Sequence, residues 1–159
     1  MGKGTTMVVR LPWLRDARPH ESAALPVARL DGVHVLVVDD DPDTLMLVAE
    51  VLRTSGAEVD VASSAREALT NVEKLKPDVV VSDVSMPDMD GYALIRKLRE
   101  LPADRGGGTP ALALTAFARS EDAQRAFSAG FQLHAPKPID PATLTTLVAS
   151  LARQAPSLA

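Results

Sequence analysis

The protein has 159 residues, 46% hydrophobic and 24% charged, a composition typical of one globular domain with an extension. Its 17 Lys and Arg against 21 Asp and Glu give a net charge of −4, which argues against binding to a nucleic-acid backbone. No cysteine is present, which excludes disulfides, and no apolar run approaches the ~20 residues that span a bilayer. We therefore expect a cytoplasmic protein with no membrane segment in this sequence.

The first 31 residues differ in composition from the rest of the chain. A Gly-Lys-Gly-Thr-Thr run precedes a short apolar strand at residues 7–12, and a polar linker with Pro and Arg follows. The run lacks the GxxxxGK[ST] spacing of a phosphate-binding loop, so we interpret it as a turn. We expect an N-terminal extension at residues 1–31, a main domain at 32–153 and a C-terminal tail at 154–159.

From residue 33 onwards, short apolar runs alternate with segments of helical periodicity. The runs predict five strands, at residues 33–38, 57–61, 78–83, 110–115 and 131–135. Start and stop residues delimit the five helices, which we expect between Asp41 and Gly56, Ser64 and Pro77, Gly91 and Leu98, Ser120 and Gly130, and Asp140 and Leu151. Such alternation predicts a parallel sheet with helices on both faces and right-handed crossovers.

Three local patterns carry finer expectations. The spacing of the fourth helix places Ala123, Ala126 and Phe127 inward. The glycine run at residues 106–108 predicts a loose connection before the fourth strand. Pro136 cannot donate to a sheet ladder, which places the fifth strand at a sheet edge or ends it there.

Five polar residues follow or end the predicted strands: Asp39, Asp40, Asp83, Thr115 and Lys137. The carboxyl ends of parallel strands meet at one edge of a sheet, so these side chains should converge on one small mouth. Three carboxylates so close repel one another, and a hard cation usually offsets such a charge. The sequence therefore predicts a Mg²⁺ site at this mouth.

Each of these residues also has an ordinary interpretation. Residues 39–43 could be a solvated helix start, where acidic side chains favour the helix dipole. Thr115 alone fits a strand-end hydroxyl, and Lys137 alone fits a surface lysine. Their joint occurrence, each after an apolar strand, is what these interpretations do not explain.

In these residues and their spacing, the chain resembles the receiver domain of response regulators in two-component signalling. The likeness covers residues 32–153 and rests on Val37-Val38-Asp39-Asp40, Asp83-x-x-Met86-Pro87-x-x-x-Gly91, Thr115-Ala116 and Lys137-Pro138. It implies a flavodoxin-like (βα)5 fold, a doubly wound parallel sheet in strand order 2-1-3-4-5. It also implies that a histidine kinase or histidine phosphotransfer protein transiently phosphorylates Asp83.

The resemblance also implies roles for the residues at the mouth. Asp39 and Asp40 would hold Mg²⁺ together with Asp83 and the backbone carbonyl of Ser85. Lys137 would supply a compact positive charge to the phosphoryl oxygens, and its bond to the following proline is cis in the family. A carboxylate that attacks a phosphoryl group needs such neutralisation, because catalysis there is mainly positioning and electrostatics.

Other positions relate to switching and to the lifetime of the phosphorylated state. Thr115 would contact the phosphoryl group, and His134 stands where receivers often carry an aromatic switch residue. Ser85 and Phe117 would flank the phosphoryl group, where polar side chains can orient a water for hydrolysis. Because Phe117 cannot do so, we expect phosphorylated Asp83 to be long-lived.

The N-terminal extension carries a second resemblance, over about eleven residues. Residues 2–12 are similar to the closing glycine box and last strand of a histidine-kinase ATP-binding domain. This would make the chain the C-terminal piece of a hybrid histidine kinase. We expect a monomer or weak dimer that catalyses its own phosphorylation and slow dephosphorylation but turns over no independent substrate.

Two alternatives stay open from the sequence. A Mg²⁺-dependent phosphohydrolase of the haloacid dehalogenase type also uses an aspartate after a parallel strand, but Asp43 breaks that family's DxDx[TV] motif. Sustained turnover of a phosphate ester would favour this reading. The other alternative is a pseudo-receiver that acts only as an interaction module, which failure to take up phosphoryl groups would favour.

Overall fold

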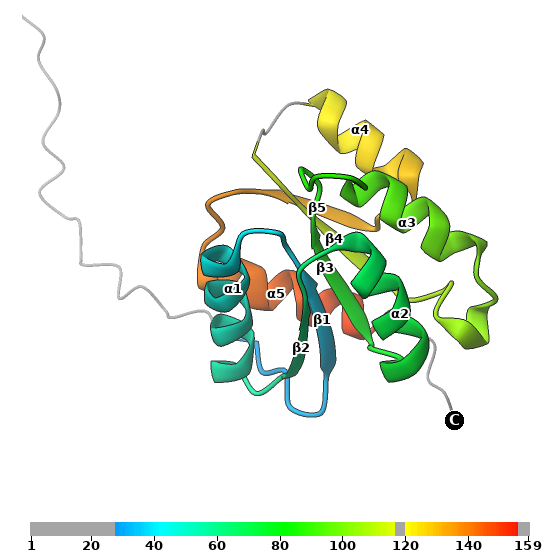
Figure 1. Ribbon diagram of the computed structural model, residues 1–159. Coiled ribbons are helices and arrows are strands. Elements are labelled where there is room, and N and C mark those ends of the chain that lie inside the picture. The colour runs from blue at the N-terminus through cyan, green and yellow to red at the C-terminus, as the bar shows by residue number, and fades with distance from the viewer. Residues whose placement is uncertain (1–27, 117–119, 156–159) are drawn as a thin grey trace, which may run out of the picture.

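The computed structural model describes residues 28–116 and 120–155 (Figure 1). Its strands are β1 His34–Val38, β2 Glu58–Ala62, β3 Val79–Asp83, β4 Ala111–Thr115 and β5 Leu133–Pro136. Its helices are α1 Pro42–Thr54, α2 Ala65–Leu75, α3 Gly91–Glu100, α4 Ser120–Ala129 and α5 Pro141–Ala152, with a 3₁₀ turn, η1, at Ala103–Arg105. The strands form one parallel sheet in the order β2-β1-β3-β4-β5, which confirms the predicted fold class and strand order.

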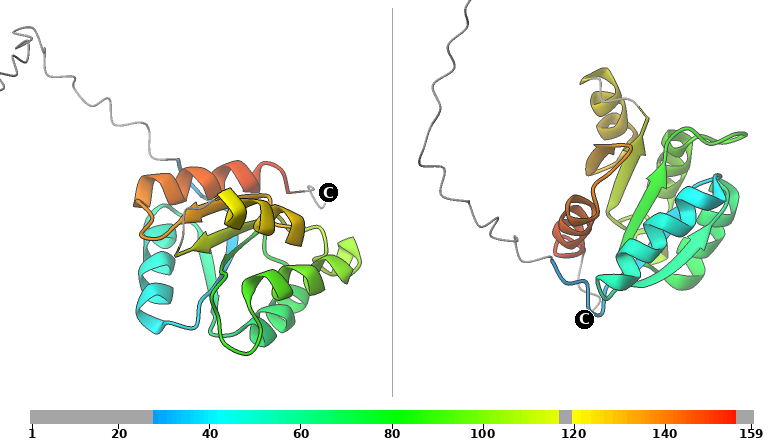
Figure 2. Two further views of the ribbon diagram at one scale, coloured as in Figure 1. Left: turned by 90° about the horizontal axis from the view of Figure 1, so that it is seen from above. Right: turned by 90° about the vertical axis from the view of Figure 1, so that its left-hand side faces the viewer.

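Helices bury the sheet on both faces. α2, α3 and α4 cover one face, and α1 and α5 cover the other (Figure 2). Within β1, Val35 and Val37 pack toward α1 and α5, whereas Leu36 and Val38 pack on the opposite face. Because successive side chains of a strand point to opposite faces, a strand buried on both sides is a continuous apolar run, as residues 35–38 are.

Short polar side chains fix where the helices begin. Asp41, Ser64, Asp90 and Asp140 each precede a helix, and each side chain accepts a hydrogen bond from the backbone N–H three residues on. Glu67 also supports the start of α2, because its carboxylate accepts the backbone N–H of Ser63, the residue before the cap, at 2.8 Å. The helices therefore start close to the carboxyl ends of the strands that precede them.

The structure corrects one expectation about α4 and confirms one about β5. Phe127 is half-exposed and packs edge-on against His134, with ring centroids 5.8 Å apart, so its predicted inward position is wrong. Ala126 and Ala129 face the core instead, because only small side chains fit between α4 and its neighbours. Pro136 ends β5, which lies at the sheet edge as predicted.

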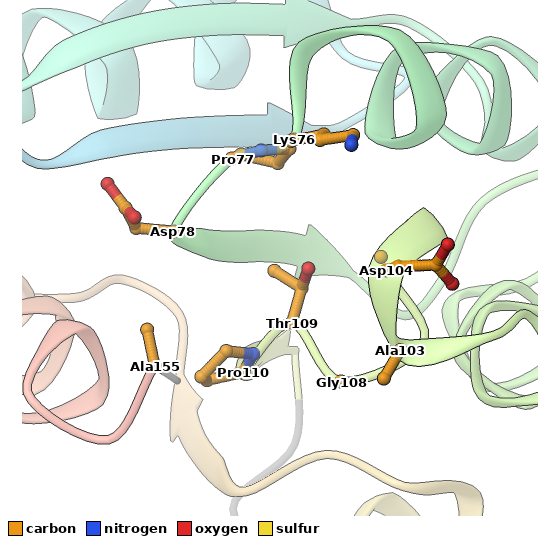
Figure 3. A pocket seen from close by; sticks show the side chains of 10 residues that line it. Lys76, Pro77, Asp78, Ala103, Asp104, Gly108, Thr109, Pro110 and Ala155 are labelled. Atoms are coloured by element: carbon orange, nitrogen blue, oxygen red, sulfur yellow. The ribbon is translucent and has the colours of Figure 1, made fainter. Parts of the chain in front are cut away.

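A small cavity lies at the amino ends of β3 and β4, opposite to the end that carries the predicted site residues (Figure 3). Its volume is about 60 Å³. The carboxylates of Asp78 and Asp104 on its wall point away from one another, and Asp78 accepts the backbone N–H of His34 at 2.8 Å. This cavity therefore brings together no set of groups that suits catalysis or metal binding.

Gly91, the first residue of α3, is in contact with the end of β3. Its N–H donates to the carbonyl of Val84 at 3.1 Å, and a Cβ built on it would lie 2.4 Å from the carbonyl oxygen of Asp83. Both neighbours are backbone atoms, so the contact cannot be relieved by turning a side chain. The glycine allows the loop that follows Asp83 to fold back tightly on the strand.

We predict that Gly91→Ala lowers the free energy of unfolding by about 1–3 kcal/mol, because the added methyl group forces the backbone around Asp83 to shift. Urea denaturation measures the change. Gly108→Ala is the matched control, since a Cβ there would meet only the Ala103 methyl at 4.0 Å. Equal stability of the two variants would contradict the packing argument.

Candidate functional site

The structure brings the five predicted polar residues to the carboxyl end of the sheet. Asp39 and Asp40 follow β1, Asp83 ends β3, Thr115 ends β4 and Lys137 follows β5. β1, β3, β4 and β5 are consecutive neighbours in the sheet, so segments far apart in the sequence meet at one mouth. The convergence expected from the alternating pattern is therefore present.

Three carboxylates form the acidic part of this mouth. One oxygen from each of Asp39, Asp40 and Asp83 lies within 4.8 Å of the others. Asp39 and Asp83 are only 3% and 5% exposed, whereas Asp40 is open to solvent. Burial of charged groups is unfavourable unless they are paired, so the two buried carboxylates need a counter-charge.

Lys137 provides that counter-charge. Its Nζ lies 2.6 Å from Asp39 Oδ2 and 3.0 Å from Asp83 Oδ1. Burial lowers the pKa of Lys137, but the hydrogen bonds to the two carboxylates outweigh this effect and raise the pKa above its usual value. The side chain is therefore an ammonium ion, and one positive charge faces three negative ones.

Backbone N–H groups hold the two buried carboxylates in place. Asp39 Oδ1 accepts the N–H of Asp41 at 2.9 Å, and Asp83 Oδ2 accepts the N–H of Ser85 at 3.0 Å. In both cases an aspartate binds the backbone two residues further on, the pattern of an Asx turn. Each carboxylate thus has one oxygen on Lys137 and the other on its own loop.

The loop after β5 positions Lys137. The backbone N–H of Lys137 donates to the carbonyl oxygen of Thr115 at 2.7 Å, which fixes the loop to the end of β4. The Lys137–Pro138 peptide bond is cis, as the family resemblance implied. Thr115 itself is buried beside Asp83, because the register pairs Asp83 with Leu114.

The remaining predicted residues lie at different distances from this centre. Ser85 is exposed, and its backbone contacts Asp83. His134 is half-buried in β5, where it contacts Phe127, and it is not part of the carboxylate cluster. Phe117 lies outside the described residues, so its role stays a prediction.

Two cavities flank the mouth, and sequence reasoning missed both. One, of about 430 Å³, is mostly apolar and lies between α1 and the β5–α5 loop, with Ala116 and Lys137 on its wall. The other, of about 520 Å³, is more polar and includes Asp40 and Asp88. Each is built from segments that lie far apart in the chain, which no local pattern reveals.

Residues 35–149 match the response regulator receiver domain family. The chain belongs to this family. The receiver is 52% identical over 119 residues to an uncharacterized 14.6 kDa protein of Leptolyngbya boryana, a match that covers 75% of this chain and 89% of that protein. It is 31% identical over 153 residues to the sensor protein EvgS of Escherichia coli K12, covering 94% of this chain and 12% of EvgS. The receiver thus spans only about an eighth of that relative.

Solved structures support the same assignment. The chemotaxis protein CheY4 of Vibrio cholerae superposes with a TM-score of 0.70 at 33% identity, covering 75% of this chain and 98% of that one. This is a receiver domain of the response regulator type with the flavodoxin-like fold. In the part of the chain that the structure describes, no helix has the length and apolarity needed to cross a membrane.

We predict that Asp40→Asn raises the free energy of unfolding by up to about 1 kcal/mol in chelator at low salt, since it removes repulsion from two nearby carboxylates. Asp43→Asn is the matched control: Asp43 lies in the first turn of α1, where a negative charge stabilises the helix, so its loss should be slightly destabilising. Urea denaturation at low and high salt measures both. Destabilisation by Asp40→Asn would show that the cluster is not under repulsion.

Proposed function

We propose that this receiver accepts a phosphoryl group on Asp83 from a histidine kinase or histidine phosphotransfer protein and signals by a conformational shift. The observation that carries the proposal is the contact of the buried Asp83 carboxylate with the Lys137 ammonium, at 3.0 Å, inside a cluster of three carboxylates. The phosphohydrolase and pseudo-receiver alternatives gain no support from the family match.

In the proposed reaction an Asp83 oxygen forms a bond to phosphorus while the bond from phosphorus to the donor's imidazole nitrogen breaks. The imidazole leaves with the electron pair, so no proton has to be removed from Asp83. The N–H of Ser85 orients the carboxylate at Oδ2. Lys137, held by Asp39, then faces the new phosphoryl oxygens, and the Thr115 hydroxyl lies on the next strand.

We further propose that Asp39, Asp40 and Asp83, with the backbone carbonyl of Ser85, hold Mg²⁺. The donor set fits a hard cation, because it consists of carboxylate oxygens grouped within 4.8 Å and carries excess negative charge even with Lys137 in place. When bound, the ion would neutralise charge on the phosphoryl oxygens. The chain's own part is to hold the two buried carboxylates in a fixed orientation.

Switching is proposed to run through Thr115 and His134. A phosphoryl group on Asp83 that contacts Thr115 and Lys137 would connect Asp83 to β4 and to the loop after β5. The face formed by α4, β5 and α5 would then shift. We expect a partial shift, because changing the ratio of two conformational states from 1:99 to 99:1 needs ~5.5 kcal/mol of differential binding free energy. Ser85 and Phe117 are proposed to set how long the phosphorylated state lasts.

The chain is further proposed to derive from a hybrid histidine kinase, with residues 1–31 as the end of the kinase domain and linker. The match to EvgS covers 94% of this chain, so it extends into residues 1–31. The receiver domain would then span residues 32–153, followed by a tail at 154–159. We propose that it works in the cytoplasm as a monomer or weak dimer.

We predict that incubation with acetyl phosphate and Mg²⁺ adds the mass of one phosphoryl group, and that Asp83→Asn abolishes this gain. Intact-protein mass spectrometry measures it. Asp88→Asn is the matched control, because Asp88 is an exposed carboxylate on the same loop and its backbone φ of 64° suits asparagine. A mass gain that survives Asp83→Asn would refute the assignment.

We predict that chelation of Mg²⁺ stops this phosphorylation and that Asp40→Ala weakens Mg²⁺ binding about tenfold or more, as loss of a charged ligand implies. Isothermal titration with Mg²⁺ measures binding without any phosphoryl donor. Asp43→Ala, which removes a neighbouring carboxylate outside the cluster, should bind Mg²⁺ as the wild type does. Phosphorylation that continues in excess chelator would rule out the metal's role.

A further inference from the structure

Arg99, in the last turn of α3, connects that helix to two segments at the amino ends of β4 and β5, residues 107–109 and 130–132. Its guanidinium donates to the carbonyl oxygens of Gly107 and Thr109, each at 2.7 Å, and to Gly130 O at 2.9 and 3.1 Å. It also donates to Gln132 Oε1 at 3.0 Å. Burial lowers the pKa of Arg99, yet all of these acceptors are uncharged. We call Arg99 and these four acceptor residues the Arg99 anchor.

Gln132 connects the anchor to the sheet. Its Oε1 accepts the N–H of Ala111 at 2.8 Å, its own N–H donates to the Ala111 carbonyl at 3.0 Å, and its Nε2 donates to Gly130 O at 3.0 Å. Ala111 is the first residue of β4, so the turn between α4 and β5 is fixed to the sheet as well as to α3. The glycine run that the sequence predicts to be loose provides one of the anchor's acceptors, Gly107, and Thr109 comes directly after the run.

Gly130 allows this close approach. It has a φ of +114°, which side chains other than glycine rarely adopt. A Cβ on it would lie 2.9 Å from Arg99 Cγ and 3.2 Å from Ile95 Cγ2. The stop of α4 is therefore shaped around the Arg99 side chain.

The rest of α4 is held less firmly. Its buried residues in the described part are alanines, Ala126 and Ala129, which contribute little apolar contact. The exposed Arg125 of α4 also lies over the ring of Tyr92 in α3, at 4.6 Å from the centroid. An exposed cation–π contact is weaker than a single hydrogen bond to a charged group, and Arg99 makes five such hydrogen bonds beyond the other end of α4. The two ends of the helix are therefore unequally attached.

We propose that Arg99 is a positioning residue that fixes the C-terminal end of α4, so that the helix rearranges by tilting about this end. The movable end follows β4, the strand that ends at Thr115 in the mouth. A ten-residue helix is ~15 Å long, so a tilt of about 10° displaces its far end by roughly 2.5 Å. The proposal rests on the proposed function only because phosphorylation of Asp83 supplies the force for the tilt.

Amide hydrogen exchange and chemical shifts, with and without beryllofluoride as a phosphoryl mimic, test the anchor in three variants. Arg99→Met keeps most of the aliphatic stem but removes every donor, and Arg99→Lys keeps the charge without the fork. Arg96→Met, an exposed arginine of the same helix, is the matched control. In wild type and control, beryllofluoride should change signals around Ala116 and the first half of α4 but leave residues 130–132 unchanged.

In Arg99→Met we expect the changes to spread to residues 130–132, and amide exchange there to be roughly tenfold faster or more even without the mimic. Amide exchange in Arg99→Lys should be intermediate between wild type and Arg99→Met. This variant replaces Arg99→Met in the test if Arg99→Met does not fold. A variant that loses stability but keeps the wild-type pattern of changes would overturn the proposal. So would equal exchange along α4 in the unliganded wild type, whereas a wild type that ignores beryllofluoride would refute the proposed function instead.

Discussion

Two buried carboxylates share one ammonium ion, and the site depends on this pairing. Asp39 and Asp83 lie at the carboxyl ends of neighbouring strands. Lys137, which is 98 residues after Asp39 in the sequence, contacts both. Without Lys137 both carboxylates would be buried among like charges, which proteins tolerate poorly. With it, the cluster still carries more negative than positive charge. The fold thus stabilises a centre with excess negative charge, which is what the proposed binding of a cation requires.

Much of this arrangement could be predicted from the sequence, for a physical reason. A strand that is buried on both faces is a continuous apolar run, so the position where the run stops, as at Asp83, marks the carboxyl end. Periodicity alone predicted a parallel sheet, but the strand order came from the resemblance to receivers. The contact of Lys137 with both carboxylates needed that order, because β5 and β1 are not neighbours in the sheet.

Other features could not be predicted from the sequence, because they depend on the room between packed helices and on which backbone carbonyl groups lie nearby. Ala126 and Phe127 are adjacent in α4, and hydrophobicity favours burying the phenylalanine, yet the space beside α3 admits the alanine. Arg99 resembles any charged residue near a helix C-terminus, where such charges are common. Its partners are mostly backbone carbonyl oxygens, which every residue has, so no pattern of side chains in the sequence predicts them.

Lys137 and Arg99 lie at opposite ends of the sheet, and each side chain suits its end. Lys137 is a compact charge on a flexible stem, paired with carboxylates whose own partners can change when an anion arrives. Arg99 is a planar fork bound to neutral oxygens in fixed directions, so no charge change at the mouth competes for it. A rearrangement that begins at Lys137 can therefore alter the carboxyl end of the sheet without releasing the opposite end. In the proposed switch, this asymmetry would confine the change to one surface while the rest of the sheet stays in place.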